Sequence, residues 1–293
     1  MVGPMNCLEE LTMGVLDGAL TVVTGGGTGL GRALALEAAR RGSRVLIAEQ
    51  SDASGVVEEL RGSGATAEWL QTDVADYAAV RRLADYARAT FGSVNVLINN
   101  AAGGAGMGSL EQVDPEAAAR TFQINISGYC NTIHAFGADL RSSATAGKPA
   151  YVLNVGSEHS LGVPPHVAPL SAYTVSKYAE LGVTDVARRD FAGSGVDISL
   201  LAPGWIRTEK VSAFMAESPE FAAQVEPYAQ SPSLVAYAAF DGQLDRRYLI
   251  VTNPKSVPFA TAHAEAVLGE LKNPVTPDPN ACPVAFLWNQ EEK

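Results

Sequence analysis

Cysteine and histidine are scarce in this sequence, and long apolar runs are absent. The 293 residues include three cysteines and four histidines. Cys7, Cys130 and Cys282 are far apart and lack CxxC spacing, which excludes a disulfide framework or a cysteine zinc site and indicates a reducing compartment. The histidines show no HExxH or paired spacing, so no metal site is expected. Because residues 1–16 also lack the pattern of a secretory signal, we expect a cytoplasmic protein without a membrane-spanning helix.

Basic residues are outnumbered by acidic ones. The chain carries 21 Lys and Arg against 32 Asp and Glu, a formal net charge of −11. A phosphate backbone selects clusters of Lys and Arg, so this balance argues against a nucleic-acid partner. Hydrophobic residues make up 47% of the chain and charged residues 18%. That composition supplies a large core and excludes global disorder.

Short apolar segments alternate with helical patterns along most of the chain. The apolar runs predict strands at 20–24, 44–48, 65–70, 94–98, 151–155, 196–201 and 248–252. The intervening patterns predict helices at 29–41, 52–61, 77–91, 171–191, 231–240 and 258–271, and a long helix that starts at Asp114-Pro115. Apolar strands joined by helices form parallel sheets that are covered on both faces by right-handed crossovers. The fold class is therefore α/β: a doubly wound, Rossmann-type parallel sheet of about seven strands with helices on both faces.

One continuous domain accounts for most of the length. Residues 18–252 contain the whole alternation of strands and helices and predict a single Rossmann-type domain. Residues 1–17 are expected to be an N-terminal extension, and residues 253–293 a C-terminal helix and arm. Between residues 203 and 228 the pattern loosens into a segment rich in Pro, Glu and Ala. We expect this segment to be a mobile insertion.

A glycine-rich loop, TGGGTGLG, joins the first predicted strand to the first predicted helix at residues 24–31. Glycine allows a sharp turn and a close backbone approach to a pyrophosphate, and the helix N-terminus offers free N–H groups to the anion. Glu49 ends the second strand, where a carboxylate accepts hydrogen bonds from ribose hydroxyls and repels a 2′-phosphate. The loop and Glu49 together predict a dinucleotide site that favours NAD over NADP. A plain turn and a solvated strand end are the alternatives.

Tyr173 and Lys177 are four residues apart and therefore share one face of a predicted helix. An unperturbed tyrosine has a pKa of about 10, and a nearby ammonium group lowers that pKa because it favours the phenolate. Tyr173 can then act as general acid in a reduction and as general base in an oxidation. By itself the spacing also fits an exposed pair on an amphipathic helix.

Ser157 lies just past the fifth predicted strand, at the edge where open α/β sheets bind ligands. Its hydroxyl can donate to a substrate oxygen beside Tyr173. Ser160 and Ser171 are the alternatives, but neither follows the strand as closely. No GxSxG motif surrounds Ser157, which argues against a hydrolase.

Taken together, these pieces resemble the short-chain dehydrogenase/reductase family of the TGxxxGxG and YxxxK type. The resemblance extends over residues 18–208, about two thirds of the chain, and the pieces follow the family's order. They are Thr24 to Gly31, Asp73-Val74, Asn99 to Ala102, Asn125, Ser157, Tyr173 with Lys177, and Pro203-Gly204. Ala102 and Gly156 replace a glycine and a serine of the family pattern. The C-terminal region departs further, because residues 246–254 (RRYLIVTNP) stand where the family has a VDGG-like turn.

The resemblance implies an NAD-dependent oxidoreductase that transfers a hydride between a nicotinamide cofactor and a secondary alcohol or ketone. Ser157, Tyr173 and Lys177 would be catalytic, and Asn125 would hold a water that relays protons to the lysine. A buried polar residue in a kinked helix is the alternative for Asn125. The implied cofactor contacts are Gly25, Gly27, Thr28, Gly29, Leu30, Gly31, Glu49, Gln50, Asp73, Val74, Asn100, Ala101, Ala102, Tyr173, Lys177, Pro203, Gly204, Ile206 and Thr208.

The resemblance also implies specific roles for Asp73 and Asn99. Asp73 would accept a hydrogen bond from the adenine amine, with Val74 against the ring, or else cap the following helix. Asn99 would brace the central sheet.

The substrate pocket is expected between the loops at 102–109 and 158–170 and the segment after Trp205. Candidate substrate contacts are Glu158, His159, His166, Trp205, Phe214 and Met215.

Other functions and assemblies fit the same motifs. A redox-neutral lyase or epimerase could use this fold with a tightly held NAD, and a regulatory protein could bind the dinucleotide without catalysis. The C-terminal arm could cover the active site or a neighbouring subunit, so we expect a homodimer or a homotetramer. The expected partner is a small alcohol or ketone, with no nucleic acid and no membrane.

Overall fold

The strands of this chain form one parallel sheet. The computed structural model describes residues 14–104 and 106–275. The sheet has the order β3-β2-β1-β4-β5-β6-β7, and every neighbouring pair is parallel. The strands are β1 (Leu20–Thr24), β2 (Arg44–Glu49), β3 (Ala67–Gln71), β4 (Val96–Asn99), β5 (Tyr151–Val155), β6 (Asp197–Ala202) and β7 (Leu249–Val251). The predicted fold class is confirmed.

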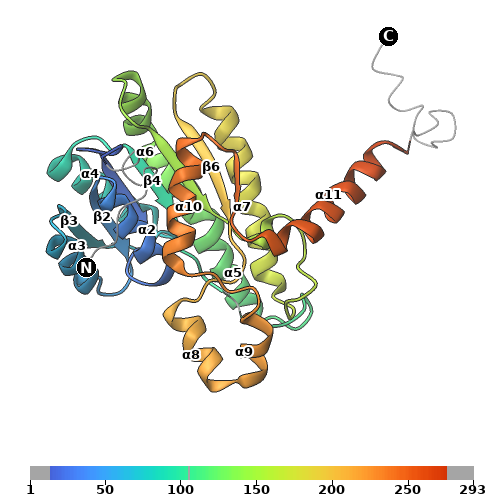
Figure 1. The fold of residues 1–293 in the computed structure, drawn as a ribbon. Coiled ribbons are helices and arrows are strands. Elements are labelled where there is room, and N and C mark those ends of the chain that lie inside the picture. Colours follow the sequence, from blue (N-terminus) through green and yellow to red (C-terminus); the bar gives the residue numbers. More distant parts are fainter. Residues whose placement is uncertain (1–13, 105, 276–293) are drawn as a thin grey trace, which may run out of the picture.

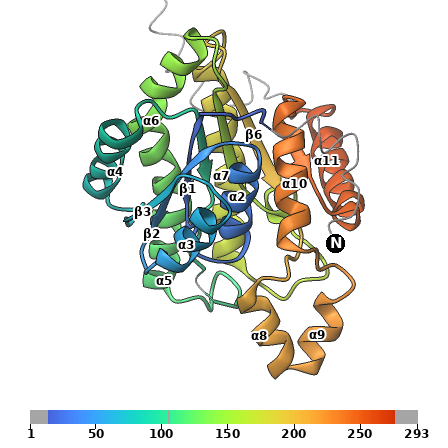
Figure 2. The ribbon, with the colours of Figure 1, turned by 60° about the vertical axis from the view of Figure 1, so that its left-hand side comes forward.

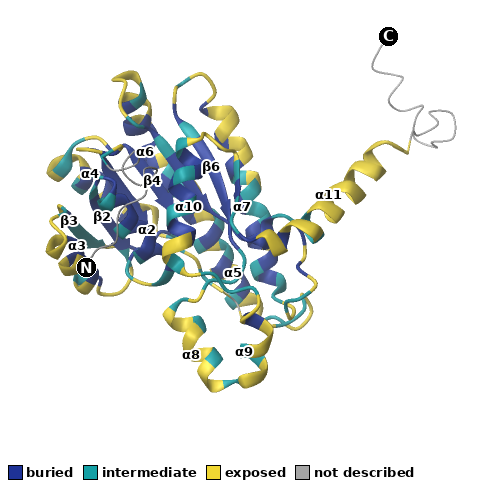
Figure 3. Cartoon of the chain, in the orientation of Figure 1, coloured by how far each residue is buried: buried dark blue, intermediate teal, exposed yellow. Residues whose placement is uncertain are grey.

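Helices cover both faces of the sheet (Figures 1 and 2). One face carries α2 (Gly29–Arg40), α3 (Ser54–Gly62) and α10 (Pro232–Leu244), and the other carries α4 (Tyr77–Phe91), α6 (Gly128–Thr145) and α7 (Ser171–Asp190). Successive strand residues point to opposite faces, so β1 places Val23 in the first core and Val22 in the second. Helices cover both cores, and the central strands of the sheet are buried (Figure 3).

The strand order reverses beside β1. The chain runs outward from β1 to β2 and β3, then returns to β4 on the other side of β1. The loops that leave β1 and β4 therefore lead to helices on opposite faces, the arrangement that places a ligand crevice at the carboxyl ends of the strands in open α/β sheets. The predicted site residues lie in loops at this edge, at the end of an adjoining strand, or in helices such as α7 and the first turn of α2.

The long helix predicted from Asp114 is interrupted. Asp114 caps α5 (Pro115–Phe122), as expected, by accepting from the Ala117 N–H at 2.9 Å. The chain then passes through a π-helical turn, Gln123–Ser127, before α6 begins. A π turn adds a residue to the helical repeat and is common at functional sites. Asn125 lies in this turn.

The segment 203–228, predicted to be a mobile insertion, instead contains two helices. These are α8 (Glu209–Glu217) and α9 (Pro219–Val225). Thr208 and Ser218 cap them, accepting from the N–H groups of Val211 and Phe221 at 3.2 Å each. The prediction missed these helices because they are short, with nine and seven residues. In Figures 1 and 2 they pack against each other outside the main body.

The predicted C-terminal helix is present as α11 (Val257–Leu271), and it leads away from the body of the molecule in Figure 1. No residue of α11 is buried, as the yellow ribbon in Figure 3 shows. The predicted arm lies mostly outside the described residues. None of the described helices is both long and apolar enough to cross a bilayer.

Candidate active site

The glycine loop follows β1 in a tightly packed turn. Gly31 lies in the first turn of α2, and a Cβ atom there would lie 1.9 Å from the carbonyl oxygen of Gly25. Gly25 itself has a φ of +64°, and a Cβ there would lie 2.8 Å from Cα of Ala101. Asn100 braces the turn from the end of β4, since its Nδ2 donates to the carbonyls of Thr24 and Gly25 at 3.0 and 2.9 Å. Glycine is therefore required at both positions for the loop to lie against β4.

The N-terminus of α2 faces an anionic group in this structure. Thr28 is the N-cap residue, but its side chain makes no capping bond. Instead the N–H of Gly29 donates to Oε2 of Glu209, at the start of α8, over 3.0 Å. Unpaired N–H groups and the positive end of the helix dipole attract anions at this position. A carboxylate thus occupies a place that suits a phosphate, and the loop fits a pyrophosphate in this respect. Leu30, by contrast, is buried in the core beneath α2.

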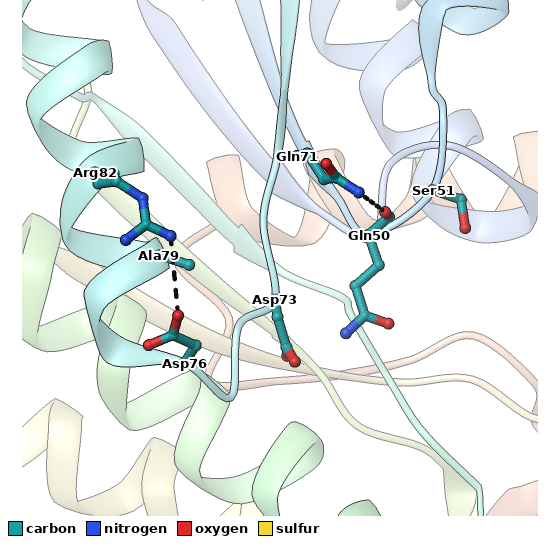
Figure 4. A pocket seen from close by; sticks show the side chains of 7 residues that line it. All are labelled: Gln50, Ser51, Gln71, Asp73, Asp76, Ala79 and Arg82. Atoms are coloured by element: carbon teal, nitrogen blue, oxygen red, sulfur yellow. Dashed lines mark hydrogen bonds and ion pairs between the residues drawn. The ribbon is translucent and has the colours of Figure 1, made fainter.

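Glu49 ends β2 beside the loop. Its Oε2 accepts from the N–H of Gly27 at 3.1 Å and its Oε1 accepts from the N–H of Gln50 at 2.9 Å. A hollow of about 580 Å³ opens next to it, at the carboxyl ends of β2 and β3. Figure 4 shows its lining, which is Gln50, Ser51, Gln71, Asp73, Asp76, Ala79 and Arg82. The hollow lies where the resemblance places the adenosine half of a dinucleotide, and two of the predicted contacts line it.

Asp73 lies in this lining with its carboxylate already engaged. Oδ1 accepts from the N–H of Ala75 at 3.0 Å, and Oδ2 accepts from Arg120 at 2.6 Å. Burial alone would raise the pKa of Asp73, but Arg120 and the Ala75 N–H lower it overall. The helix cap of α4 is Asp76, whose Oδ1 accepts from the N–H of Ala78. The alternative role of Asp73 as that cap is therefore wrong.

Val74 is more deeply placed than Asp73. Only 5% of its surface is exposed, and it packs with the core between the sheet and α4. A Cβ on Gly128 would lie 2.7 Å from its Cγ2. Most of the Val74 side chain therefore packs in the core, and only its exposed edge could contact an adenine ring.

Ser157 follows β5, and its conformation is fixed locally. Its hydroxyl oxygen accepts from the backbone N–H of Ser160, while the hydroxyl of Ser160 accepts from the N–H of Ser157 at 3.2 Å. A hydroxyl that accepts in this way still has its own proton to donate. Ser157 is 7% exposed, whereas Ser160 is fully buried. Ser157 is thus the better placed of the two to meet a substrate oxygen.

Tyr173 and Lys177 lie one turn apart in α7, as predicted. The Nζ atom of Lys177 lies 5.3 Å from the centre of the Tyr173 ring. Tyr173 is partly exposed, and Lys177 is 2% exposed. The ammonium group donates to the carbonyl of Val155, at the end of β5, over 3.0 Å. This contact ties the face of α7 that carries Tyr173 and Lys177 to the strand that leads to Ser157.

A buried carboxylate, which sequence reasoning missed, completes this part of the site. Both carboxylate oxygens of Glu180 lie 2.9 Å from Nζ of Lys177. Burial raises the pKa of Glu180 to about 7, although Lys177 acts in the opposite direction. For Lys177, burial alone would lower the pKa, but the charges of Glu180 and Tyr173 raise it overall. The available signal was a second charged residue three positions after the lysine, on the same helix face.

Asn125 is fully buried in the π turn, and its amide joins two parts of the site. Its Oδ1 accepts from the N–H of Gly103 at 2.7 Å, and its Nδ2 donates to Ser176 Oγ at 2.9 Å. The loop after β4 is thereby linked to α7. The amide bonds Ser176, the residue before Lys177, and the water relay to the lysine remains a prediction. Asn99, by contrast, donates to Asn154 Oδ1 and accepts from Thr132, so it braces the sheet centre as the resemblance implied.

The loop after Ser157 contributes two buried groups. His159 stands edge-on to the Tyr173 ring at 5.3 Å, and its Nδ1 lies 2.8 Å from Thr174 Oγ1. Burial, helped by the charges of His166 and Lys177, lowers the pKa of His159 to about 4. At neutral pH the wall beside Tyr173 is therefore an uncharged imidazole.

Glu158 holds surrounding segments together. Its Oε2 accepts from Ser256 Oγ at 2.5 Å, and its Oε1 lies 3.3 Å from His166. His166 in turn stacks on Tyr228 with ring centres 4.3 Å apart. These contacts join the loop 158–170 to the chain before α10 and before α11. They place Glu158 and His166 in structural contacts as well as near the predicted substrate pocket.

The predicted segment after β6 reaches the glycine loop. Pro203 accepts from the N–H of Glu158 through its carbonyl at 2.8 Å. Ile206 is partly buried against the core, and Thr208 lies beside the glycine loop, where a Cβ on Gly29 would be 3.0 Å from its Cγ2. Trp205 and Phe214 both contact Phe221 of α9, and Met215 is partly exposed on α8. The remaining predicted contacts, Ala101, Ala102 and Gly204, lie in the loops that leave β4 and β6.

Comparison with known proteins identifies the family. Residues 19–218 match the family model described as short chain dehydrogenase. The chain is 35% identical over 201 residues to the cis-4-hydroxycyclohexanecarboxylate dehydrogenase of Sinomonas cyclohexanicum, across 68% of this chain and 77% of that protein. The chain belongs to the short-chain dehydrogenase family. It is also 28% identical over 233 residues to the A-factor type gamma-butyrolactone 1'-reductase (1S-forming) of Streptomyces virginiae, across 77% of this chain and 88% of that protein.

A solved structure agrees with this assignment to the short-chain dehydrogenase family. A short chain dehydrogenase/reductase from Burkholderia phymatum, in complex with NAD, has a TM-score of 0.75 to this chain at 29% identity. The match covers 91% of this chain and 99% of the other. Family membership and the dehydrogenase and reductase names of the relatives support an oxidoreductase. Among residues 14–104 and 106–275, no three His, Cys, Asp or Glu side chains gather as metal ligands would.

Proposed function

We propose that this protein is an NAD-dependent oxidoreductase that interconverts a secondary alcohol and a ketone. The observation that carries the proposal is that Lys177, which lies beside the Tyr173 ring, donates to Val155 two residues before Ser157, at the same sheet edge as the glycine loop. The NAD complex of the Burkholderia phymatum relative supports the choice of cofactor class. The names of the Sinomonas and Streptomyces relatives, one a dehydrogenase and one a reductase, support chemistry in either direction.

Each residue has a role that follows from its contacts. Bound NAD would supply the hydride acceptor or donor. The Ser157 hydroxyl donates a hydrogen bond to the substrate oxygen. This bond holds the carbon to be oxidised or reduced beside Tyr173. Tyr173 takes the alcohol proton during oxidation and returns it during reduction. Lys177 favours the phenolate form because its ammonium lies beside the ring. The uncharged imidazole of His159 closes one side of Tyr173 and keeps water from it.

The choice of NAD over NADP rests on Glu49. Its carboxylate stands beside the glycine loop and the hollow at β2 and β3, where a ribose 2′-phosphate would be repelled. Thr28 in the loop adds no positive charge that could bind such a phosphate. We also propose that residues 18–252 form the catalytic unit, that residues 253–293 are appended to it, and that the protein is a cytoplasmic homodimer or homotetramer.

Tyr173→Phe tests the mechanism. This change removes only the hydroxyl, so NAD binding should remain nearly intact while kcat falls at least about 100-fold, the usual contribution of general acid–base catalysis. NADH absorbance is followed with a panel of secondary and benzylic alcohols, sugars and steroids. Tyr178→Phe, on the same helix, is the matched control, because its hydroxyl lies near His263 at 3.3 Å.

Two outcomes would refute the proposal. Retained turnover in Tyr173→Phe would reject the role of the tyrosine. A substrate that is converted without net change in NADH absorbance would instead assign the redox-neutral alternative.

A further inference from the structure

Glu180 is an unusual neighbour for a catalytic lysine because the pair has no access to water. Glu180 is 0% exposed and Lys177 is 2% exposed. Nζ lies 2.9 Å from each carboxylate oxygen and 3.0 Å from the carbonyl of Val155. The three donors of the ammonium group are thereby directed to two partners. The position of Nζ relative to Tyr173 is set jointly by the carboxylate and the end of β5.

The stability of the fold gives no reason for a carboxylate at this position. A fully buried ion pair loses the hydration of both charges, and an apolar pair of similar volume is often as stable or more so. Burial raises the pKa of Glu180 to about 7, which shows how strongly this environment disfavours the charge. A carboxylate here can instead control the charge with which Lys177 acts on Tyr173.

Among the groups around Lys177, Glu180 is the one that balances the charge of its ammonium group. Tyr129 on α6 is 1% exposed, and its hydroxyl donates to the same Val155 carbonyl at 2.9 Å. Tyr173 on α7 and His159 in the loop after β5 are the other titratable groups that act on Lys177. Burial raises the pKa of Tyr129, and the charge of Glu180 raises it further, so Tyr129 stays neutral. Apart from Tyr173 as a phenolate, Glu180 is the group among the described residues acting on Lys177 that can carry a negative charge near neutrality.

We propose that Glu180 is a positioning residue for the reaction: it holds Lys177 against β5 and offsets its charge, so that the proton affinity of Tyr173 is set by the Lys177–Glu180 pair. The inference rests on the proposed function, in which Tyr173 moves the proton. Without the carboxylate, the ammonium would act uncompensated on Tyr173 and would stabilise the phenolate too strongly. Alcohol oxidation would then begin at a lower pH, and ketone reduction would lose its proton donor at a lower pH.

Glu180→Gln tests this role through the pH profile of kcat for alcohol oxidation. The change keeps the shape of the side chain and removes one negative charge. The acidic limb of the profile should move to lower pH by about one unit, the size expected for one charge a few ångströms away at an intermediate dielectric. Glu180→Asp keeps the charge but draws it away from Nζ, so its profile should shift in the same direction by less.

Glu37→Gln is the matched control. Glu37 in α2 is also buried, and its Oε1 accepts from Nε of the fully buried Arg41 at 2.7 Å. Its loss should lower the melting temperature without moving the pH profile. A merely structural role for Glu180 would give the same result as this control.

The outcomes separate the inference from the proposed function. If the Glu180→Gln profile superimposes on that of the unaltered protein while Tyr173→Phe abolishes turnover, the inference falls and the proposed function stands. If Glu180→Gln does not fold, an unshifted Glu180→Asp profile overturns the inference, and a shifted one supports it. If the unaltered protein oxidises no alcohol and reduces no ketone with either nicotinamide cofactor, the proposed function fails instead.

Discussion

Gly31→Ala should impair the use of NAD more than it impairs the fold. The added Cβ would lie 1.9 Å from the Gly25 carbonyl oxygen and 2.5 Å from Nδ2 of Asn100, which itself bonds that carbonyl. Real Cβ atoms essentially never approach another heavy atom within 3.0 Å. The glycine loop must therefore move by about 1 Å, which typically costs an enzyme about 100-fold in rate. Overpacking of this kind lowers the free energy of unfolding by about 1–3 kcal/mol.

Steady-state kinetics with NAD as the varied substrate, combined with urea unfolding, measures both effects of Gly31→Ala. Gly182→Ala is the control, because Gly182 lies inside α7 and a Cβ there would meet nothing within 4 Å. Alanine in a helix interior stabilises by up to about 1 kcal/mol relative to glycine, so this variant should be more stable and unchanged in kcat/KM. Equal kcat/KM for the two variants would refute the close approach of the cofactor to the loop.

Two further predictions concern single charges. Isothermal titration should show tighter binding of NAD than of NADP. In Glu49→Ala the ratio of the NADP Kd to the NAD Kd should fall at least about tenfold, equivalent to about 1.4 kcal/mol. Tighter NADP binding by the unaltered protein would contradict the assignment. His159 has a pKa near 4 in the folded chain against an ordinary 6.5, so its contribution to stability is present above pH 6.5 and lost as the pH falls toward 4. The loss amounts to at most about 3 kcal/mol, and urea unfolding of His159→Gln should show an acid dependence weaker by that amount, whereas an unchanged dependence would contradict the linkage.

The regular elements of this fold were predictable because local patterns and tertiary packing agree. The helix predicted at 77–91 is α4 at those bounds, and the strands predicted at 20–24 and 151–155 are β1 and β5. Strand ends elsewhere shift by one or two residues, as between the predicted 94–98 and the observed β4. Such shifts arise because the last residues pair according to their neighbours in the sheet, which a single sequence does not reveal.

The interrupted and capped segments were less predictable. The π turn around Asn125 depends on hydrogen bonds to Gly103 and Ser176, which are 22 and 51 residues away. Asp73 and Asp76 are equally plausible helix caps by type, and the start of α4 decides for Asp76. Both outcomes depend on three-dimensional proximity, so residue types and spacing alone leave them open.

The candidate site could be assembled from the sequence because a parallel sheet converts order along the chain into proximity in space. Each strand ends at the same edge, so Glu49, Asn100 and Ser157 meet there although they come from widely separated segments. Tyr173 and Lys177 reach the edge from α7 by helix periodicity, which is also local. Glu180 follows the same periodicity, yet its charge is what an exposed helix residue would carry, and only the structure shows that it is buried. What the three-dimensional structure adds is therefore the electrostatic setting of the site, a buried Lys177–Glu180 ion pair beside Tyr173.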